Sequence, residues 1–242
     1  QVYKSFGYKG TNSLSLEVSS IPTINLEKRL SYLIHYPYGC VEQTTSSVFP
    51  QLFLSELMEL DTDKKREIEK NVRAGIKRLK QFQTREGGFA YWPDDYDSHE
   101  WASNYVGHFL IEAKARGFEV SDILINNWID YQTEKATEWS ESNNTLPQTY
   151  RLYLLAKAGK PNIGAMNRMR LKIKENNLSL WYLAASYQLI GKNSVAQELI
   201  KKAPTSITYD QSDIYSFGSI DRDNAIVLHM MSELNLKEQA WK

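Results

Sequence analysis

Apolar side chains recur at helical spacing over most of this chain. In residues 64–83 they return every three or four positions, which is the period of one face of an α-helix. The members of this stripe are Ile68, Val72, Ile76 and Leu79. Asp61 and Thr62, just before it, have side-chain oxygens that can cap a helix N-terminus. The pattern therefore predicts a helix from Lys64 to Gln83 with this stripe buried.

The same spacing predicts helices along most of the remaining sequence, separated by turn signals such as Arg116-Gly117 and Gly159-Lys160-Pro161. A first helix is expected to begin at a cap formed by Asn25. The other predicted ranges are 40–60, 99–116, 121–137, 146–158, 163–175, 178–190, 193–202 and 221–234. Pro50 should kink or split the helix over 40–60, because proline lacks a backbone N–H donor. A run of about ten short helices closes into a bundle, a solenoid or a toroid.

Two stretches depart from this helical pattern. Residues 13–19 alternate polar and apolar, which is the period of a half-buried strand, and Pro22 ends the alternation. We interpret residues 1–24 as a β extension or a remnant of a neighbouring domain, and residues 25–242 as one helical domain. Residues 205–219 are irregular and are expected to form a long loop. The last helix reaches Lys242 without a cap, which suggests a truncated chain. The predicted fold class is all-α with a short N-terminal β extension.

The composition is typical of a globular protein, with 42% apolar and 24% charged residues. Because 29 basic residues balance 29 acidic ones, there is no electrostatic reason to expect nucleic acid or an anionic membrane as a partner. No apolar run reaches the roughly 20 residues needed to span a bilayer. The N-terminus lacks the pattern of a signal peptide, so the chain is either cytosolic or a piece of an exported protein.

The sequence contains a single cysteine, Cys40, which excludes an internal disulfide. Such a cysteine is an inert core residue, a reactive thiol or a partner in an unusual covalent bond. With one cysteine and scattered histidines, no pair of possible ligands has metal-binding spacing, so we expect no metal site and no cofactor. The Asp221-Arg222-Asp223 run is typical of a helix cap rather than of a functional site.

The residues with distinctive chemistry lie in the run Tyr36-Pro37-Tyr38-Gly39-Cys40-Val41-Glu42-Gln43-Thr44-Thr45-Ser46. Pro37 and Gly39 predict a turn, and Gly39 permits a close approach of the backbone. Cys40 and Gln43 are three residues apart and therefore face each other on a helical turn. A helix N-terminus also favours a thiolate. Attack of this sulfur on the Gln43 side-chain carbonyl, with loss of ammonia, would give an internal thioester.

This run resembles the Cys-x-Glu-Gln thioester motif of the alpha-2-macroglobulin and complement family, in the form of its bacterial members. Val41 differs from vertebrate members, which usually have glycine at that position. A second block is also similar to the family, and it comprises residues 87–92 (Gly-Gly-Phe-Ala-Tyr-Trp) and 101–106 (Trp-Ala-Ser-Asn-Tyr-Val). The resemblance extends from residue 14 to the end of the chain.

The resemblance implies an α/α toroid of paired helices. The toroid would be partial or near-complete here, because the family plan has about twelve helices. It also implies that Cys40 and Gln43 form the thioester, with Gly39 and Glu42 shaping the turn. Aromatic side chains are expected to shield the bond from water, although ordinary core packing explains them equally well. These side chains are Tyr36, Tyr38, Tyr91, Trp92 and Trp101.

The function implied by the resemblance is that of a single-use protease trap rather than a turnover enzyme. In the family, cleavage of a bait region in another domain exposes the thioester, which then acylates a nucleophile, often a lysine of the protease. The expected partners are proteases and the other domains of a larger macroglobulin, with no nucleic acid and no direct membrane contact. Since bacterial members are thought to be periplasmic and often lipid-anchored, a periplasmic or extracellular location is expected.

Histidine separates this sequence from some complement members, in which a histidine well after the motif attacks the thioester first. That histidine would fall within residues 135–148, where this chain has none. The histidines present are His35, His99, His108 and His229. We carry the family role over to none of them and expect direct reaction with amines. His99 follows the Trp92 block and is able to approach the site, although a solvated loop position explains it more simply.

Three other functions fit parts of the sequence. A cysteine protease would pair Cys40 with a histidine, but no protease signature surrounds Cys40 and Gln43 would have no role. A terpenoid-cyclase-like toroid would explain the Gln83–Trp92 segment, but the Asp94-Asp95-Tyr96-Asp97 run has the wrong spacing for that class of metal site. A non-covalent interaction scaffold of the same fold would leave Cys40 inert.

Overall fold

A computed structural model describes residues 8, 30–140, 144–174, 177–208 and 218–236. Within these ranges the regular secondary structure is helical, with one isolated antiparallel β-bridge between Gln83 and Phe89. The predicted all-α class is therefore confirmed for the described part of the chain. The strand over residues 13–19, the Asn25 cap and the domain boundary after residue 24 lie outside these ranges and stay predictions.

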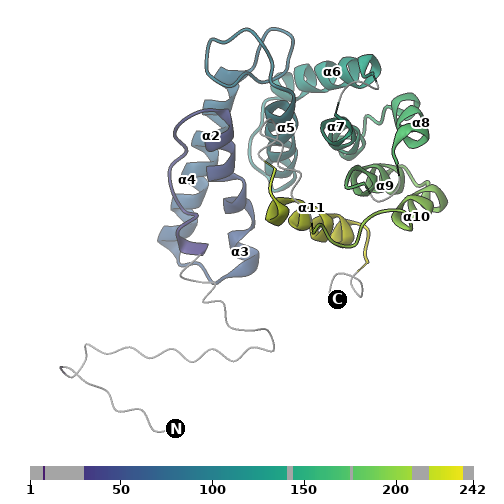
Figure 1. Cartoon of the computed structure of the whole chain (residues 1–242). Helices are drawn as coiled ribbons and strands as arrows, with labels where there is room; N and C mark the ends of the chain where they lie inside the picture. Colours follow the sequence, from purple (N-terminus) through teal and green to yellow (C-terminus); the bar gives the residue numbers. More distant parts are fainter. Residues whose placement is uncertain (1–7, 9–29, 141–143, 175–176, 209–217, 237–242) are drawn as a thin grey trace.

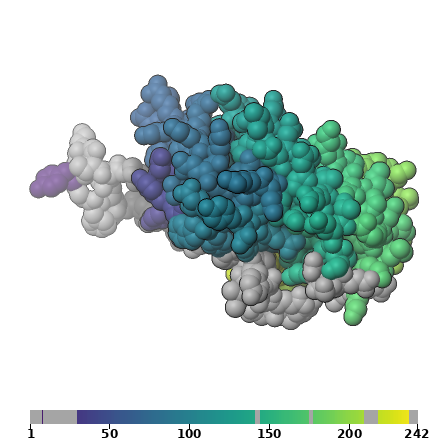
Figure 2. Space-filling model, turned by 90° about the horizontal axis from the view of Figure 1, so that it is seen from above, coloured from purple at the N-terminus to yellow at the C-terminus, as the bar shows by residue number. Residues whose placement is uncertain are grey.

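The helices are short and follow one another around a ring (Figure 1). In the described residues they are α2 (Val41–Val48), α3 (Leu54–Leu57), α4 (Thr62–Leu79), α5 (Glu100–Ala115), α6 (Asp122–Glu138), α7 (Thr145–Lys157), α8 (Ile163–Lys172), α9 (Ser179–Leu189), α10 (Asn193–Ile200) and α11 (Ile220–Glu233), with 3-10 helices η1 (Pro50–Phe53) and η2 (Lys80–Phe82) after α2 and α4. Helices α5, α7, α9 and α11 form the inner layer, and α6, α8 and α10 lie outside it (Figure 1). Seen from above, the N-terminal helices lie at one end of the molecule and the green α8–α10 segment at the other (Figure 2).

Burial separates the inner helices from the outer ones. Every residue from Pro147 to Ala156 in α7 and from Ser179 to Tyr187 in α9 is buried. By contrast, α8 and α10 bury only a few apolar positions each, on the side that faces α7 and α9. A helix that is enclosed on all sides belongs to a core, whereas one with a single buried stripe covers it. The pairing of inner and outer helices gives the fold its toroid-like form.

The predicted helix over 64–83 is confirmed as α4 followed by η2. Asp61 Oδ1 accepts the Lys64 backbone N–H at 2.8 Å, and all four residues of the predicted stripe are buried. The predicted split at Pro50 is also confirmed, because this proline begins η1 and divides the 40–60 segment into α2, η1 and α3. The 3-10 turn accepts proline at its first position, where no N–H is needed.

The Asp221-Arg222-Asp223 run lies at the start of a helix, as predicted, but it does not contain the capping residue. Ser219 is the N-cap of α11, and its Oγ accepts the Arg222 backbone N–H at 3.1 Å. The two aspartates lie in the first turn, where their charge suits the helix dipole. Most of the predicted loop over 205–219 lies outside the described residues. In the described part of the chain, no helix combines the length and apolar character that crossing a bilayer requires.

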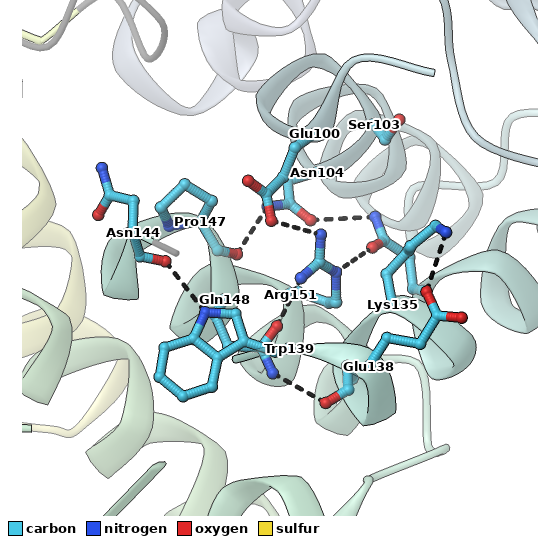
Figure 3. Close-up of polar contacts among 12 residues, drawn as sticks. Glu100, Ser103, Asn104, Lys135, Glu138, Trp139, Asn144, Pro147, Gln148 and Arg151 are labelled. Carbon is cyan, nitrogen blue, oxygen red and sulfur yellow. Dashed lines mark hydrogen bonds and ion pairs between the residues drawn. The ribbon is translucent and has the colours of Figure 1, made fainter. Parts of the chain in front are cut away.

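A buried polar network joins α5, α6 and α7 (Figure 3). Arg151 on α7 is only 2% exposed, and its guanidinium donates to Gln132 Oε1 on α6 at 2.7 Å and to Glu100 Oε1 on α5 at 2.8 Å. Gln148 accepts a further bond from Arg151, and Gln132 donates to Asn104 Oδ1 at 3.0 Å. A buried charge is costly unless it is paired, so these contacts fix how the three helices pack.

Candidate functional site

The cysteine motif enters α2 through a sharp bend. Gly39 has a φ of +90°, a left-handed conformation that strains any residue with a side chain. The backbone returns to an extended conformation at Cys40, which is the N-cap of α2. The bend predicted from Pro37 and Gly39 is therefore present, and it delivers Cys40 to the start of the helix.

Cys40 and Gln43 lie side by side in the first turn of α2. The Cys40 backbone N–H donates to Gln43 Oε1 at 3.1 Å, which is the second half of a capping box with cysteine in place of serine or threonine. The carboxamide is thus folded back over the residue that carries the thiol. A Cβ on Gly39 would come within 2.0 Å of Gln43 Oε1, so the carboxamide oxygen occupies space that only glycine leaves open.

The two side chains differ in their access to solvent. Cys40 is 6% exposed, whereas Gln43 belongs to the exposed residues. The residue that would carry the acyl group is therefore open to solvent, while the residue that carries the thiol is buried. This arrangement suits an acyl group that is presented outward and a thiol that is held inward.

Arg78 binds the turn from the neighbouring helix. It lies in the last turn of α4, and its Nη2 donates to the Gly39 carbonyl at 2.7 Å while its Nε donates to Thr44 Oγ1 at 3.2 Å. Its two acceptors bracket the Cys40–Gln43 pair in the sequence. The sequence pattern does not single out Arg78, because this residue lies 39 positions from Gly39 and is one of two basic residues in that turn.

Tyr91 connects residues 87–92, part of the second family-like block, to the cysteine motif. Its carbonyl accepts the Val41 backbone N–H at 3.1 Å, which ties the loop after η2 to the start of α2. Burial raises the pKa of the Tyr91 phenol, and the nearby Cys40 and Glu42 raise it further. The Tyr91 ring packs edge-on against His99, with 5.3 Å between ring centroids.

The other aromatic side chains predicted to shield the site occupy two different environments. Tyr36 and Tyr38 pack against each other with centroids 4.6 Å apart, and they are 42% and 70% exposed. Trp92 is also half exposed, at 52%. Trp101 is 8% exposed and lies instead between Tyr150 and the guanidinium of an α11 arginine, so its contacts are those of a core residue.

Trp101 lines a cavity of about 530 Å³ at the centre of the ring. Its wall is formed by aromatic rings together with an ion-pair network in which Lys157 binds Glu112 at 2.8 Å and Glu233 at 3.4 Å. His108 and His229 stack there with centroids 5.9 Å apart.

Glu42, predicted to shape the turn, bonds along α2 instead of across the bend. Its Oε1 accepts the Ser46 hydroxyl at 2.7 Å, and Ser46 Oγ also lies within hydrogen-bonding distance of Tyr105 OH on α5, at 3.3 Å. Its carboxylate therefore supports the first turns of α2 and their contact with α5. Gly39, by contrast, is placed directly at the bend.

The histidines use their ring nitrogens away from the thiol. His35 binds a serine of α2 at 3.1 Å, and His99 caps α5 by accepting a backbone N–H at 3.3 Å. Burial lowers the pKa of His99, a shift that a neighbouring glutamate partly offsets. In the described residues, the hydrogen bonds of His35, His99 and His108 reach groups other than Cys40, which gives a cysteine-protease pairing no support. The described residues also hold no group of three side chains able to bind a metal ion.

Comparison with known proteins gives a consistent family assignment. The family model of the A-macroglobulin TED domain matches residues 13–147, which is more than half of the chain. The alpha-2-macroglobulin of Escherichia coli (strain K12) is 30% identical over 241 residues, which cover 91% of this chain and 14% of that protein. The alpha-2-macroglobulin of Xylella fastidiosa (strain Temecula1) is 23% identical over 94% of this chain and 15% of its own length. The chain thus spans about a seventh of these relatives.

Solved structures give the same result. Native alpha-2-macroglobulin from Escherichia coli, spanning domain MG7 to the C-terminus, superposes with a TM-score of 0.74 at 29% identity, over 90% of this chain and 37% of that one. Salmonella alpha-2-macroglobulin reacted with methylamine gives a TM-score of 0.74 at 28% identity, over 91% of this chain and 16% of that one. The chain therefore belongs to the A-macroglobulin TED family, as a TED (thioester) domain of the bacterial alpha-2-macroglobulin type.

Proposed function

We propose that the chain forms an internal thioester between Cys40 and Gln43 and uses it to capture proteases covalently. The observation that carries this proposal is the bond from the Cys40 N–H to Gln43 Oε1, which holds the carboxamide against the cysteine residue. In formation, Cys40 Sγ bonds to Gln43 Cδ, and the amide nitrogen leaves as ammonia.

In capture, nitrogen and sulfur exchange the roles of attacking and leaving group. The nitrogen of an amine attacks Gln43 Cδ, the C–S bond breaks, and the sulfur leaves as a thiol after taking up the proton released by the amine. The products are an amide that joins the two proteins and a free Cys40. Because the acyl group is consumed, the chain acts once and is not a turnover enzyme.

The exposed Gln43 implies that its protection comes from outside the part of the chain that the structure describes. Water hydrolyses a thioester, and the described residues leave this side chain open to solvent. Tyr36, Tyr38 and Trp92 offer exposed aromatic surface in the segments that contact the motif. We propose that other domains of a larger macroglobulin cover this face until a protease cuts that protein. Aromatic surface of this kind is what a domain interface buries.

The similarity to alpha-2-macroglobulins is the basis for proposing proteases, and the rest of a larger protein, as partners of this chain. Structures matched by this chain include alpha-2-macroglobulin from Escherichia coli activated by trypsin or by porcine elastase. We propose amines of such proteases as the acyl acceptors, since residues 135–148 contain no histidine to form an acyl intermediate. A periplasmic or extracellular location, with a lipid anchor elsewhere in the protein, is part of the same proposal.

The first test is the intact mass of freshly purified protein, with and without methylamine, beside a Cys40→Ala control. The expected wild-type mass is short by one ammonia, and methylamine should add to Gln43 while one new thiol becomes titratable. Cys40→Ala should have its full mass and form no adduct. A full wild-type mass with a free thiol, in the longest form of the protein that its gene encodes, would contradict the proposal and favour the non-covalent scaffold.

A further inference from the structure

The peptide unit between Gly39 and Cys40 is hydrogen-bonded at both ends. Its carbonyl oxygen, on Gly39, accepts from Arg78 Nη2 at 2.7 Å. Its N–H, on Cys40, donates to Gln43 Oε1 at 3.1 Å. The cation of α4 and the reactive carboxamide of α2 are thus connected through a single planar group.

The geometry of Arg78 fixes the orientation of that peptide. Its guanidinium also donates to Thr44 Oγ1 at 3.2 Å and lies 5.5 Å from the centroid of the Phe82 ring. Thr44 is fully buried, so the second acceptor is held rigidly in the core. With one contact before Cys40 and one after Gln43, the planar fork of the arginine holds the peptide and the helix turn in one fixed relation.

The oxygen held by the Cys40 N–H is the atom on which negative charge develops. Attack on Gln43 Cδ by sulfur or by an amine gives a tetrahedral centre whose Oε1 becomes an oxyanion. A donor already in hydrogen-bonding distance of that oxygen stabilises the transition state more than the ground state. The α2 N-terminus adds its dipole in the same direction.

A charge-assisted bond at the far end of the peptide strengthens this donor. A hydrogen bond from an ionised group is roughly twice as strong as a neutral one, and bonds in a chain polarise one another. The contact between Arg78 and the Gly39 carbonyl therefore makes the Cys40 N–H a better donor, in addition to fixing its direction.

We infer that the Cys40 N–H is the oxyanion donor of the acyl-transfer site and that Arg78 is its positioning residue. This inference rests on the proposed function, because it concerns the reactivity of the same thioester. It assigns Arg78 a role in both reactions of Gln43, the formation of the thioester and its opening by an amine.

The test measures how fast methylamine releases the Cys40 thiol, as a rate constant normalised to the thioester present. The variants are Arg78→Met, which keeps an unbranched apolar stem and loses both donors, and Arg78→Lys, which keeps the charge and loses the fork. Thr44→Val removes only the second acceptor. Arg73→Met is the matched control, because Arg73 lies on the exposed face of α4 and pairs only with Glu69 in the described structure.

Loss of the donor itself commonly costs 10²–10³ in rate, so loss of its positioning residue should cost about tenfold. We expect this loss for Arg78→Met, a smaller loss for Thr44→Val, partial rescue in Arg78→Lys and no change in Arg73→Met. A folded Arg78→Met protein that never forms the thioester also supports the inference, since formation passes through the same oxyanion. Circular dichroism and the Tm of each variant separate this result from unfolding. If Arg78→Met does not fold, the normalised rate of Arg78→Lys tests the inference instead.

Two outcomes overturn the inference, and they differ. Wild-type protein that shows no ammonia loss and no methylamine adduct removes the proposed function and the inference together. Wild-type protein that reacts, beside Arg78→Met and Arg78→Lys variants whose normalised rates match it within twofold, removes the inference alone and leaves Arg78 a purely structural residue.

Discussion

At the residue scale, the arrangement of Cys40 and Gln43 depends on a position that has no side chain. Gly39 combines a φ of +90° with a Cα that lies directly under the Gln43 carboxamide oxygen. The first property strains any other residue, and the second excludes a methyl group. These two effects are separable by experiment, because Gly117 has a similar φ of +84° and open space around its Cα.

We predict that Gly39→Ala abolishes methylamine incorporation while Gly117→Ala leaves it intact. Both variants should lose about 1–2 kcal/mol of stability from left-handed backbone strain. Only Gly39→Ala places a Cβ 2.0 Å from Gln43 Oε1, which forces the carboxamide out of position. Intact mass after methylamine treatment measures the first effect, and urea unfolding measures the second. Equal incorporation in the two variants would show that the close approach is unimportant.

The sequence motif predicted the positions of Cys40 and Gln43 well, because their contact is local to one helical turn. It did not predict Arg78 or the Tyr91 carbonyl, whose contacts join segments far apart in the chain. Nor did it distinguish Trp101 from the other aromatic residues, because the sequence alone does not show whether an aromatic side chain packs in the core or beside a site. Only the packing of α5 against α7 and α11 assigns Trp101 to the central cavity.

At the element scale, hydrophobic spacing predicted where helices lie but not which of them are inside. The boundaries of α5, α6, α7 and α9 agree with prediction to within one residue or two. In α7 and α9, however, polar residues such as Gln148, Arg151 and Ser186 are as buried as their apolar neighbours. Their burial depends on partners from other helices, which a single-helix pattern does not contain.

The Arg151 network should be a principal source of coupling between α5, α6 and α7 (Figure 3). We predict that Arg151→Met lowers the free energy of unfolding by about 3 kcal/mol, because it leaves Gln132 and Gln148 oxygens buried without a donor. Urea unfolding followed by circular dichroism would measure this change. Lys135→Met is the matched control, since Lys135 pairs with Glu138 near the surface, and it should cost less than about 0.5 kcal/mol. Similar losses in both variants would contradict the prediction.

At the scale of the whole molecule, the ring brings together residues that no local pattern connects. Phe49, the N-cap of η1, and Ile226 of α11 line the same central cavity, although they lie 177 positions apart in the sequence. The toroid was expected from family resemblance, and helical periodicity alone left a bundle or a solenoid equally open. Closing the ring buries a titratable cluster, and that cluster makes the stability of the fold depend on pH.

His108 is the member of this cluster with the clearest consequence. Burial is the main cause that holds its pKa well below 6.5, and the charges of His229 and Lys157 lower it further, while Glu233 opposes them. Its Nδ1 is 2.8 Å from Tyr150 OH, a bond available to the neutral ring. The folded state therefore binds fewer protons than the unfolded state as pH falls below 6.5, so stability is present above that pH and is lost as pH decreases.

We predict that the free energy of unfolding falls between pH 7.5 and 5.5, with a slope from His108 of at most about 1.4 kcal/mol per pH unit. His108→Gln should show a shallower slope over the same range, because it lacks this titration. Glu233 does not contribute in this window, since its pKa is held at about 2, chiefly by a hydrogen bond from His229. Urea titrations at several pH values measure both slopes, and identical slopes would exclude His108 as the cause.

The burial of Cys40 has one more consequence for the proposed reaction. The sulfur that an incoming amine displaces belongs to Cys40, which is buried and lies three residues from the new amide, so the leaving group stays bound to the protein. In an acyl transfer in solution, the leaving group diffuses away, and its dilution disfavours the reverse reaction. The Cys40 thiol cannot diffuse away, so this effect is absent here. A tethered thiol also has a very high effective concentration, which by itself favours the backward step. Permanence of the captured state must therefore come from the greater stability of an amide over a thioester, and the protein contributes the speed of the exchange rather than its direction.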